Sequence, residues 1–244
     1  MHIKSKRRVN KENFNGFLQT HKTYTTMKEI ALFLSSFVFV GMTAQAQDRL
    51  EPVRTNHTAL CLRMYRQEYM RLLNVHNAKW GVFRRPSNMT ESSLTYDERA
   101  RALVYTEIEG VLWGNVTKAT TKRIEEGNSV RIIDLEEPQN YQAPSTTTTL
   151  LPIPNHMAKN LKKLWDAAVR NPEQVDWTTL DGCTWEFFVN GKRAKAHSFR
   201  KDWTRVPRLT QLVDNLMEAV SNKDTETLLQ LEQETIELRQ LFEK

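Results

Sequence analysis

The chain has few of the residue patterns on which common enzyme classes depend. Its 244 residues contain no glycine-rich phosphate-binding loop, nucleophile-elbow motif, paired-histidine zinc motif or acidic calcium-binding loop. No two of the histidines after residue 46 lie at metal-ligand spacing; they are His57, His76, His156 and His197. The sequence therefore indicates no catalytic, metal-binding or cofactor-binding residue, and we expect no cofactor.

Long hydrophobic runs are also missing, apart from one near the start. Residues 30–40 are apolar or small, follow the basic residue Lys28, and precede the small-x-small sequence Ala44-Gln45-Ala46. This order is typical of a cleaved secretory signal peptide, which we predict at residues 27–46. A membrane anchor is the alternative, but it needs about 20 apolar residues. We expect export through the Sec pathway to the periplasm or cell exterior, with no transmembrane span after cleavage.

The polar, basic segment 1–26 is long for the region before a bacterial signal peptide. Translation from Met27 would explain it, and an extended n-region is the alternative. Residues 1–46 hold seven of the 35 Lys and Arg and two of the 29 Asp and Glu. The remaining 28 basic and 27 acidic residues nearly balance. The sequence pI of about 9.3 is therefore no evidence for nucleic-acid binding.

We expect an α+β fold, in which a small antiparallel sheet packs against several amphipathic helices. The predicted parts are an N-terminal lobe at 47–137, a Pro/Thr-rich connection at 138–154 and a C-terminal lobe at 155–244, although 47–244 can also be one domain. The connection contains Thr146 to Thr149 between prolines. It is either a linker or an edge strand bounded by its prolines.

Apolar spacing and capping residues predict most of the helices. The predicted helices cover residues 59–75, 95–113, 116–126, 155–170, 207–220 and 224–242. A strand is expected within 130–135. For 94–113 the capping-box pattern Thr95-Tyr96-Asp97-Glu98 favours a helix, and the rival interpretation is a hairpin of "LTY" and "ALVY", because β-branched and aromatic residues are common there.

Asn190-Gly191 is the strongest hairpin signal in the chain. Pairing outward from this two-residue turn places Trp185 and Phe187 opposite alanines on one face, which we expect to be buried. The opposite face pairs Phe188 with Arg193, Glu186 with Lys195 and Thr184 with His197; we expect it to face solvent. Cys183 and His197 then lie on different faces, so they form no local nucleophile–base pair, and His197 is expected at the surface or rim.

The two cysteines allow one disulfide in an exported protein. A Cys61–Cys183 bond would close a loop of about 120 residues and add roughly 4–5 kcal/mol in the usual entropy model. Two buried free thiols are the alternative, and the sequence leaves both open.

A basic stretch at residues 192–208 is the candidate binding surface. Its residues are Arg193, Lys195, His197, Arg200, Lys201, Trp203 and Arg205. It could bind an anionic glycan, lipid headgroups or nucleic acid. The alternative favoured by the sequence is intramolecular, because the acidic segment 224–244 can lie across it.

From Leu151 to about residue 225 the chain resembles small exported proteins of Bacteroidota whose activity is uncharacterised. The resemblance rests on "LPIPNHMAKNLKKL", "LDGCTWEFFVNGKRAKAHS" and the amphipathic helix that follows. It implies a small α+β domain and no activity. Cys183 stands where the pattern has Ser or Thr, so no role is carried over to it.

We therefore expect a non-enzymatic binding or accessory module, whose partner could be an anionic glycan or an envelope protein. The alternatives are a hydrolase of envelope or host polymers and a binder of polyanions or nucleic acid; nucleic acid is the less expected ligand.

Overall fold

The structure is a computed structural model that describes residues 49–53, 59–75, 77–86, 90–173, 182–197 and 204–244. These residues belong to one compact unit, 46–244. The predicted signal peptide lies outside the described residues. Within the described ranges, no helix is long and apolar enough to cross a membrane.

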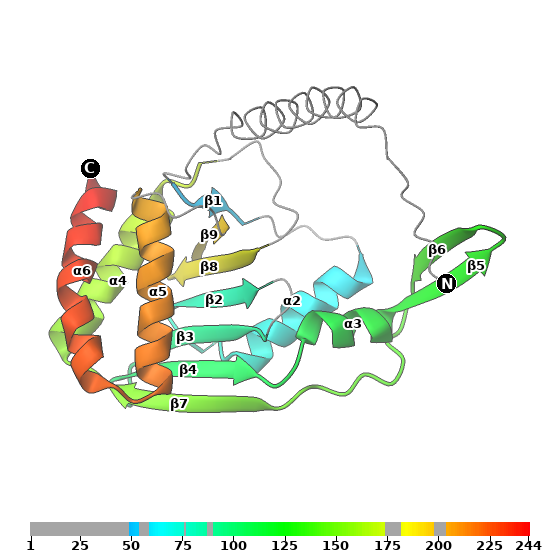
Figure 1. Cartoon of the computed structure of the whole chain (residues 1–244), viewed down its shortest axis with the longest axis horizontal. Coiled ribbons are helices and arrows are strands. Elements are labelled where there is room, and N and C mark those ends of the chain that lie inside the picture. The colour runs from blue at the N-terminus through cyan, green and yellow to red at the C-terminus, as the bar shows by residue number, and fades with distance from the viewer. Residues whose placement is uncertain (1–48, 54–58, 76, 87–89, 174–181, 198–203) are drawn as a thin grey trace, which may run out of the picture. The chain divides into compact units, whose positions relative to one another are not determined.

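The main element is a seven-stranded sheet in which every neighbouring pair is antiparallel, with the order β1-β9-β8-β2-β3-β4-β7 (Figure 1). The strands are β1 (Glu51–Pro52), β2 (Trp80–Pro86), β3 (Ser92–Asp97), β4 (Ala102–Ile108), β7 (Thr146–Pro152), β8 (Cys183–Val189) and β9 (Lys192–His197). A separate two-stranded sheet contains β5 (Thr121–Glu126) and β6 (Ser129–Asp134). The main sheet joins strands from both halves of the chain.

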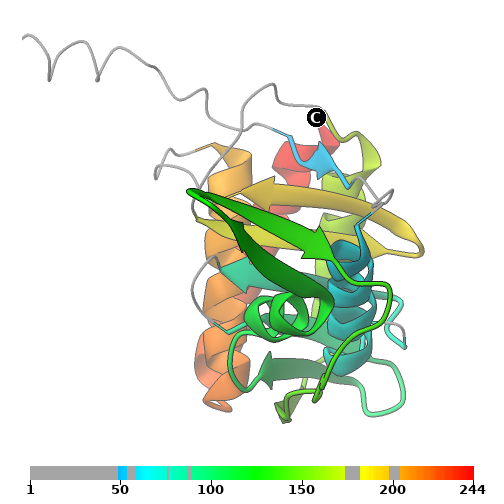
Figure 2. The ribbon, with the colours of Figure 1, turned by 90° about the vertical axis from the view of Figure 1, so that its right-hand side faces the viewer.

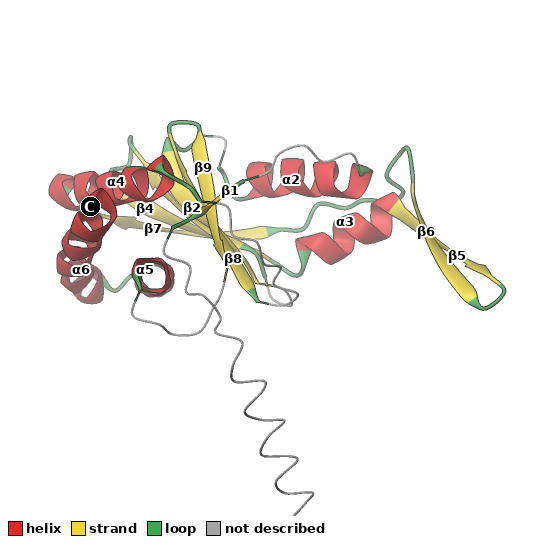
Figure 3. Cartoon of the chain, turned by 90° about the horizontal axis from the view of Figure 1, so that it is seen from above, coloured by secondary structure: helices red, strands yellow, loops and turns green. Residues whose placement is uncertain are grey.

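Helices cover both faces of the main sheet. They are α2 (Leu60–Leu72), α3 (Leu112–Thr120), α4 (Asn155–Arg170), α5 (Arg205–Ser221) and α6 (Thr225–Glu243). Figure 2 shows the strands between α5 and α2, and Figure 3 shows α4, α5 and α6 grouped at one end of the strands, with α2 and α3 at the other. The α+β fold class predicted from the sequence is confirmed.

Two hydrophobic clusters lie on opposite faces of the sheet. The larger contains α4, α5 and α6 together with one side of the strands, and at its centre Trp165 of α4 lies edge-on to Trp80 and Phe187. The smaller lies under α2, where Tyr69 stacks on Phe83 with ring centroids 4.3 Å apart. Because both faces are covered, the central strands β2, β3 and β4 are largely buried on both sides.

The central strands approach closely at Gly81 of β2. A Cβ at this position would lie 2.6 Å from the carbonyl oxygen of Leu94 and 2.9 Å from the Phe188 ring. Any side chain would therefore push β2 away from its neighbours.

The Asn190-Gly191 hairpin has the register that the sequence predicts. Phe187 pairs with Ala194, Trp185 with Ala196 and Thr184 with His197. Asn190 (φ 48°) and Gly191 (φ 83°) both have positive φ, as a type I′ turn requires. The predicted solvent exposure of the second face is wrong: α2 covers it, and Phe188 is 4% exposed.

The helix predicted over residues 95–113 is also wrong, and the rival hairpin is present as β3 and β4. Asp97 accepts hydrogen bonds from the amides of Arg99 and Ala100 at 2.7 and 3.0 Å, so its carboxylate shapes a turn instead of a helix start. Both faces of β4 are buried. The resulting continuous apolar run has no period of two, which is why it resembled a helix.

The expected helix 116–126 is shifted toward the N-terminus and shorter. It is α3, and residues 121–126 continue as β5. The Thr120 and Thr121 hydroxyls donate to the carbonyls of Val116 and Thr117, which lie in the last turn of the helix. These β-branched residues suit the extended chain that follows.

The remaining helices agree with their predicted positions to within a few residues: 59–75 contains α2, 155–170 is α4, and the last two correspond to α5 and α6. Asp224 caps α6 by accepting from the Thr227 amide at 3.0 Å. For residues 146–153, the structure contains the edge strand, β7, of the two alternatives.

Candidate functional site

The described residues of the candidate basic surface contact other residues of the same chain. Lys195 lies 3.3 Å from the Glu51 carboxylate, and His197 Nε2 lies 3.7 Å from it. The Arg205 guanidinium donates to the carbonyl of Leu241 at 3.0 Å. Arg200, Lys201 and Trp203 lie outside the described residues. The part of this surface that is described is therefore largely engaged in holding the fold together.

Arg193, a further member of that surface, belongs to an ion cluster between β8, β9 and α2. It donates to Glu186 at 2.8 Å, and Arg66 of α2 lies 3.7 Å from the same carboxylate. The Tyr69 hydroxyl also donates to Glu186, at 3.4 Å. Only 12% of the Glu186 side chain is exposed. A carboxylate with two hydrogen-bond donors and a second arginine nearby is suited to fastening α2 to the sheet, and little of it is accessible to a substrate.

The acidic segment 224–244 contacts the start of α5, in agreement with the intramolecular alternative for the basic stretch. Arg208 lies 3.6 Å from Glu237 and 4.0 Å from Glu234, both on α6. The Arg205 guanidinium also lies over the Phe242 ring, 5.5 Å from its centroid. Charges from the basic stretch are thus matched by the last helix.

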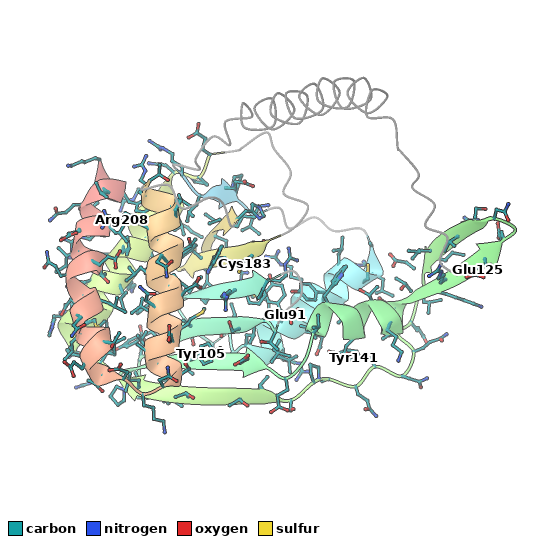
Figure 4. All side chains as sticks on the ribbon, in the orientation of Figure 1. Glu91, Tyr105, Glu125, Tyr141, Cys183 and Arg208 are labelled. Atoms are coloured by element: carbon teal, nitrogen blue, oxygen red, sulfur yellow. The ribbon has the colours of Figure 1, made fainter. Side chains whose placement is uncertain are left out.

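Cys183 lies at the start of β8, on the sheet face that α5 covers (Figure 4). Burial raises the pKa of this thiol to about 11, with Arg84 opposing the shift and Asp214 adding to it. The thiol is therefore protonated at neutral pH and is a poor nucleophile. His197 is on the opposite face, where its Nδ1 lies 3.1 Å from the Thr184 hydroxyl.

Of the two alternatives left open by the sequence, the Cys61–Cys183 disulfide is not formed: the structure has both residues as thiols. Cys61 is in the first turn of α2, where burial and the nearby Asp134 carboxylate raise the pKa of its thiol. Cys183 packs against the cluster on the other face of the sheet. The sheet itself separates the two thiols.

His197 is neither fully exposed nor a free base. Its side chain is 20% exposed. Burial and then the neighbouring Lys195 lower the pKa of its imidazole, against the opposing effect of Glu51. The rim position predicted from the sequence agrees with this partial burial.

Glu91 is a buried carboxylate that sequence analysis did not identify. It is 1% exposed and accepts from the amides of Leu112 and Trp113 at 3.0 and 3.3 Å, at the start of α3. The Tyr65 hydroxyl donates to it at 3.3 Å. This geometry is that of a helix cap supplied from 21 residues away. No local sequence pattern predicts such a contact.

Two surface hollows, of about 480 and 490 Å³, are lined mainly by charged and amide side chains. In the second of them, Arg170 pairs with Asp166 at 2.8 Å and Arg239 with Glu243 at 3.7 Å. Apolar walls, which small-molecule sites usually have, are scarce in both. Among the described residues, no group of three or more His, Cys, Asp or Glu side chains could hold a metal ion.

The two edges of the main sheet differ, and one of them is open. At one edge β1 has only two residues, Glu51 and Pro52. At the other edge β7 has seven residues, none of them charged, and it pairs with β4 alone among the described strands. Natural edge strands are usually protected by charge, proline or shortness. Along residues 146–150, β7 has none of these protections.

The hydrogen-bond pattern shows which backbone groups of β7 point outward. The Glu109 amide donates to the Ser145 carbonyl at 2.9 Å, and the Ile153 amide donates to the Arg101 carbonyl at 3.1 Å. Odd-numbered residues of β7 thus face β4, and even-numbered residues face away from the sheet. The outward residues of β7 with an N–H are Thr146, Thr148 and Leu150. Pro144 and Pro152 share this parity and lack an N–H.

This window has the residues of a strand-docking site. Thr146 and Thr148 are exposed, and Leu150 is 46% exposed. Sequence analysis identified the threonine run and its prolines. It did not show that the even-numbered residues point their backbone groups outward, so that Pro144 and Pro152 end the row of outward N–H groups. No family model, curated protein or solved structure matches the chain.

Proposed function

We propose that the chain is an exported, non-enzymatic binding or accessory module that binds an extended segment of a partner protein by adding a strand to β7. The observation that carries the proposal is the row of outward N–H and C=O groups at Thr146, Thr148 and Leu150. Strand addition to a sheet edge uses such groups for affinity and neighbouring side chains for specificity. Export is supported by the signal-peptide pattern at 27–46.

The window limits the partner segment to about five residues, because a docked strand finds no donor at Pro144 or Pro152. The exposed Leu150 side chain calls for an apolar residue opposite it, and the threonines suit β-branched or hydroxyl neighbours. The partner is therefore an uncharged, β-prone segment of another exported protein.

Internal contacts weigh against the other candidate functions. Lys195 and Arg205, which a polyanion would need, already contact Glu51 and the carbonyl of Leu241. The protonated thiol of Cys183 and the multiply paired carboxylate of Glu186 lack the reactivity and access that a hydrolase needs.

Proline at position 148 tests the proposal. Thr148→Pro removes one outward N–H and leaves the bonds to β4 intact, since the native Pro152 occupies an equivalent position. Peptides selected from a random library on the native protein should bind this variant roughly 5- to 150-fold more weakly, as expected for one unsatisfied backbone partner costing about 1–3 kcal/mol. Fluorescence anisotropy with labelled peptides gives the affinities.

Thr148→Val is the matched control, because it changes the side chain and keeps the N–H. It should retain the affinity within a few fold. N-methylation of alternate peptide residues should abolish binding in one frame only. Equal binding to native and Thr148→Pro proteins, with both folded by circular dichroism, would sink the proposal.

A further inference from the structure

The β5–β6 hairpin is exposed on both faces. None of its twelve strand residues is buried; Val130 is 49% and Ile132 71% exposed. Figures 1 and 3 show it continuing past α3, away from the main sheet. An isolated two-stranded ribbon is at best marginally stable in water. As far as the described residues show, its apolar side chains and the outer edges of its strands are therefore available for further packing and pairing.

The charges of β5 change sign at the centre of the strand, from basic residues before Ile124 to acidic residues after it. The strand reads Thr-Lys-Arg-Ile-Glu-Glu, with Lys122 and Arg123 before Ile124 and Glu125 and Glu126 after it. If a second β5 runs antiparallel with the two copies of Ile124 opposite each other, Arg123 faces Glu125 of the other copy. Lys122 then faces Glu126 of that copy. All four charges of each strand find opposite charges.

The backbone pattern permits this register. Glu126 and Ser129 flank the two-residue turn at Gly127-Asn128, and residues flanking such a turn exchange their hydrogen bonds. Lys122, Ile124 and Glu126 therefore bond to β6, and Thr121, Arg123 and Glu125 point outward. In the antiparallel pairing, Arg123 and Glu125 form the hydrogen-bonded pairs across the new interface. The copies of Ile124 form the closer, non-hydrogen-bonded pair.

Neighbouring registers are excluded by the same rules. A shift by one residue would oppose outward and inward backbone groups. A shift by two places Arg123 or Glu125 opposite its own copy, which is a like-charge contact. On β6, a two-fold pairing sets Arg131 against itself or against an apolar residue. The Ile124-centred register of β5 is the one in which charge and backbone agree.

We propose that β5 is a self-association edge, through which two copies of this chain join by an antiparallel β5–β5 pairing centred on Ile124. The result is a four-stranded sheet with two-fold symmetry, an isologous interface. The existing contact between Arg123 and Glu125 of one strand is 3.8 Å long, with both side chains about 70% exposed. It is weak in water, and pairing gives each charge a second partner. This interface is independent of β7.

Charge exchange tests the proposal in the full chain. Glu125→Lys with Glu126→Lys makes β5 wholly basic, and Lys122→Glu with Arg123→Glu makes it wholly acidic. Sedimentation equilibrium from about 10 µM to 1 mM should give a dimer for the native protein. Each variant alone should dimerise about 10- to 100-fold more weakly, because four attractive pairs become repulsive.

An equimolar mixture of the two variants should form a heterodimer, and the chain carrying all four substitutions should dimerise like the native protein. Glu136→Lys with Glu137→Lys makes the same charge change at exposed positions outside the hairpin and should leave dimerisation unchanged. A native protein that stays monomeric overturns the proposal. So does a dimer that the β5 variants leave intact, or one that Thr148→Pro abolishes, since that result would place self-pairing on β7.

Discussion

The β8–β9 and β5–β6 hairpins are built by the same local rule and lie in opposite surroundings. Each has a two-residue turn with one glycine, from which the two strands pair outward residue for residue. The first is covered on both faces, so that Phe187 is fully buried; in the second no strand residue is buried. Local sequence therefore determines pairing and register, while the surrounding helices determine how much stability the pairing brings.

Truncating one large side chain in each hairpin should give the largest contrast. Phe187→Ala should reduce the free energy of unfolding by about 3–5 kcal/mol, because it removes a ring packed against Trp165 at 5.6 Å and leaves a cavity. Ile132→Ala should change it by less than about 0.5 kcal/mol. Urea denaturation of dilute protein measures both. Comparable losses would mean that the β5–β6 hairpin is also part of a core.

A second contrast comes from alkaline pH. Burial, and next the Glu186 carboxylate, raise the pKa of Tyr69 to about 12, above the ordinary value of 10. The unfolded chain therefore loses this proton first. Stability should be unaffected by Tyr69 below pH 10 and should fall by about 2–3 kcal/mol as pH rises from 10 to 12.

Tyr69→Phe removes this contribution, so its loss of stability between pH 9 and pH 11 should be shallower than that of the native protein. Tyr105, whose pKa burial also raises to about 12, remains in both proteins. Urea midpoints measured across this range compare the two slopes. Parallel slopes would show that Tyr69 ionises as easily in the folded protein as in the unfolded one. The β5–β6 hairpin contains no tyrosine and adds nothing to this effect.

Substitutions in the two hairpin turns should give the smallest difference in stability. Asn190 has φ 48°, so Asn190→Ala should cost about 1–2 kcal/mol. In the other turn Gly127 (φ 63°) has the positive φ and Asn128 does not, so Asn128→Ala should be nearly neutral. Thermal unfolding ranks the two variants. A neutral Asn190→Ala would contradict the type I′ assignment.

Residues 184–197 show what local sequence could predict. Asn190-Gly191 determines the turn, and the alternation of aromatics and alanines determines which face is buried. The same reasoning failed on the opposite face, because nothing near Glu186 in the sequence says that Arg66 and Tyr69 will meet it. These partners lie more than 100 residues away.

The candidate site was less predictable than the fold. The threonines and prolines of 144–152 indicated an edge strand. Which of its amides point outward, the even- or the odd-numbered ones, depends on the register with β4. The helix predicted at 95–113 concealed β4 itself. When a long-range pairing is not recognised in the sequence, the open edge that results from it is missed as well.

Glu91 has a mechanical consequence for the hairpin at the other end of α3. Its single carboxylate joins the first amides of α3 to the hydroxyl of Tyr65 on α2, and β5 begins where α3 ends. The hairpin therefore extends from a helix that is fixed to α2 both by Glu91 at its first turn and by the packing of Leu112 and Val116. A carboxylate that is 1% exposed thus helps to orient the helix from which the solvent-facing hairpin extends.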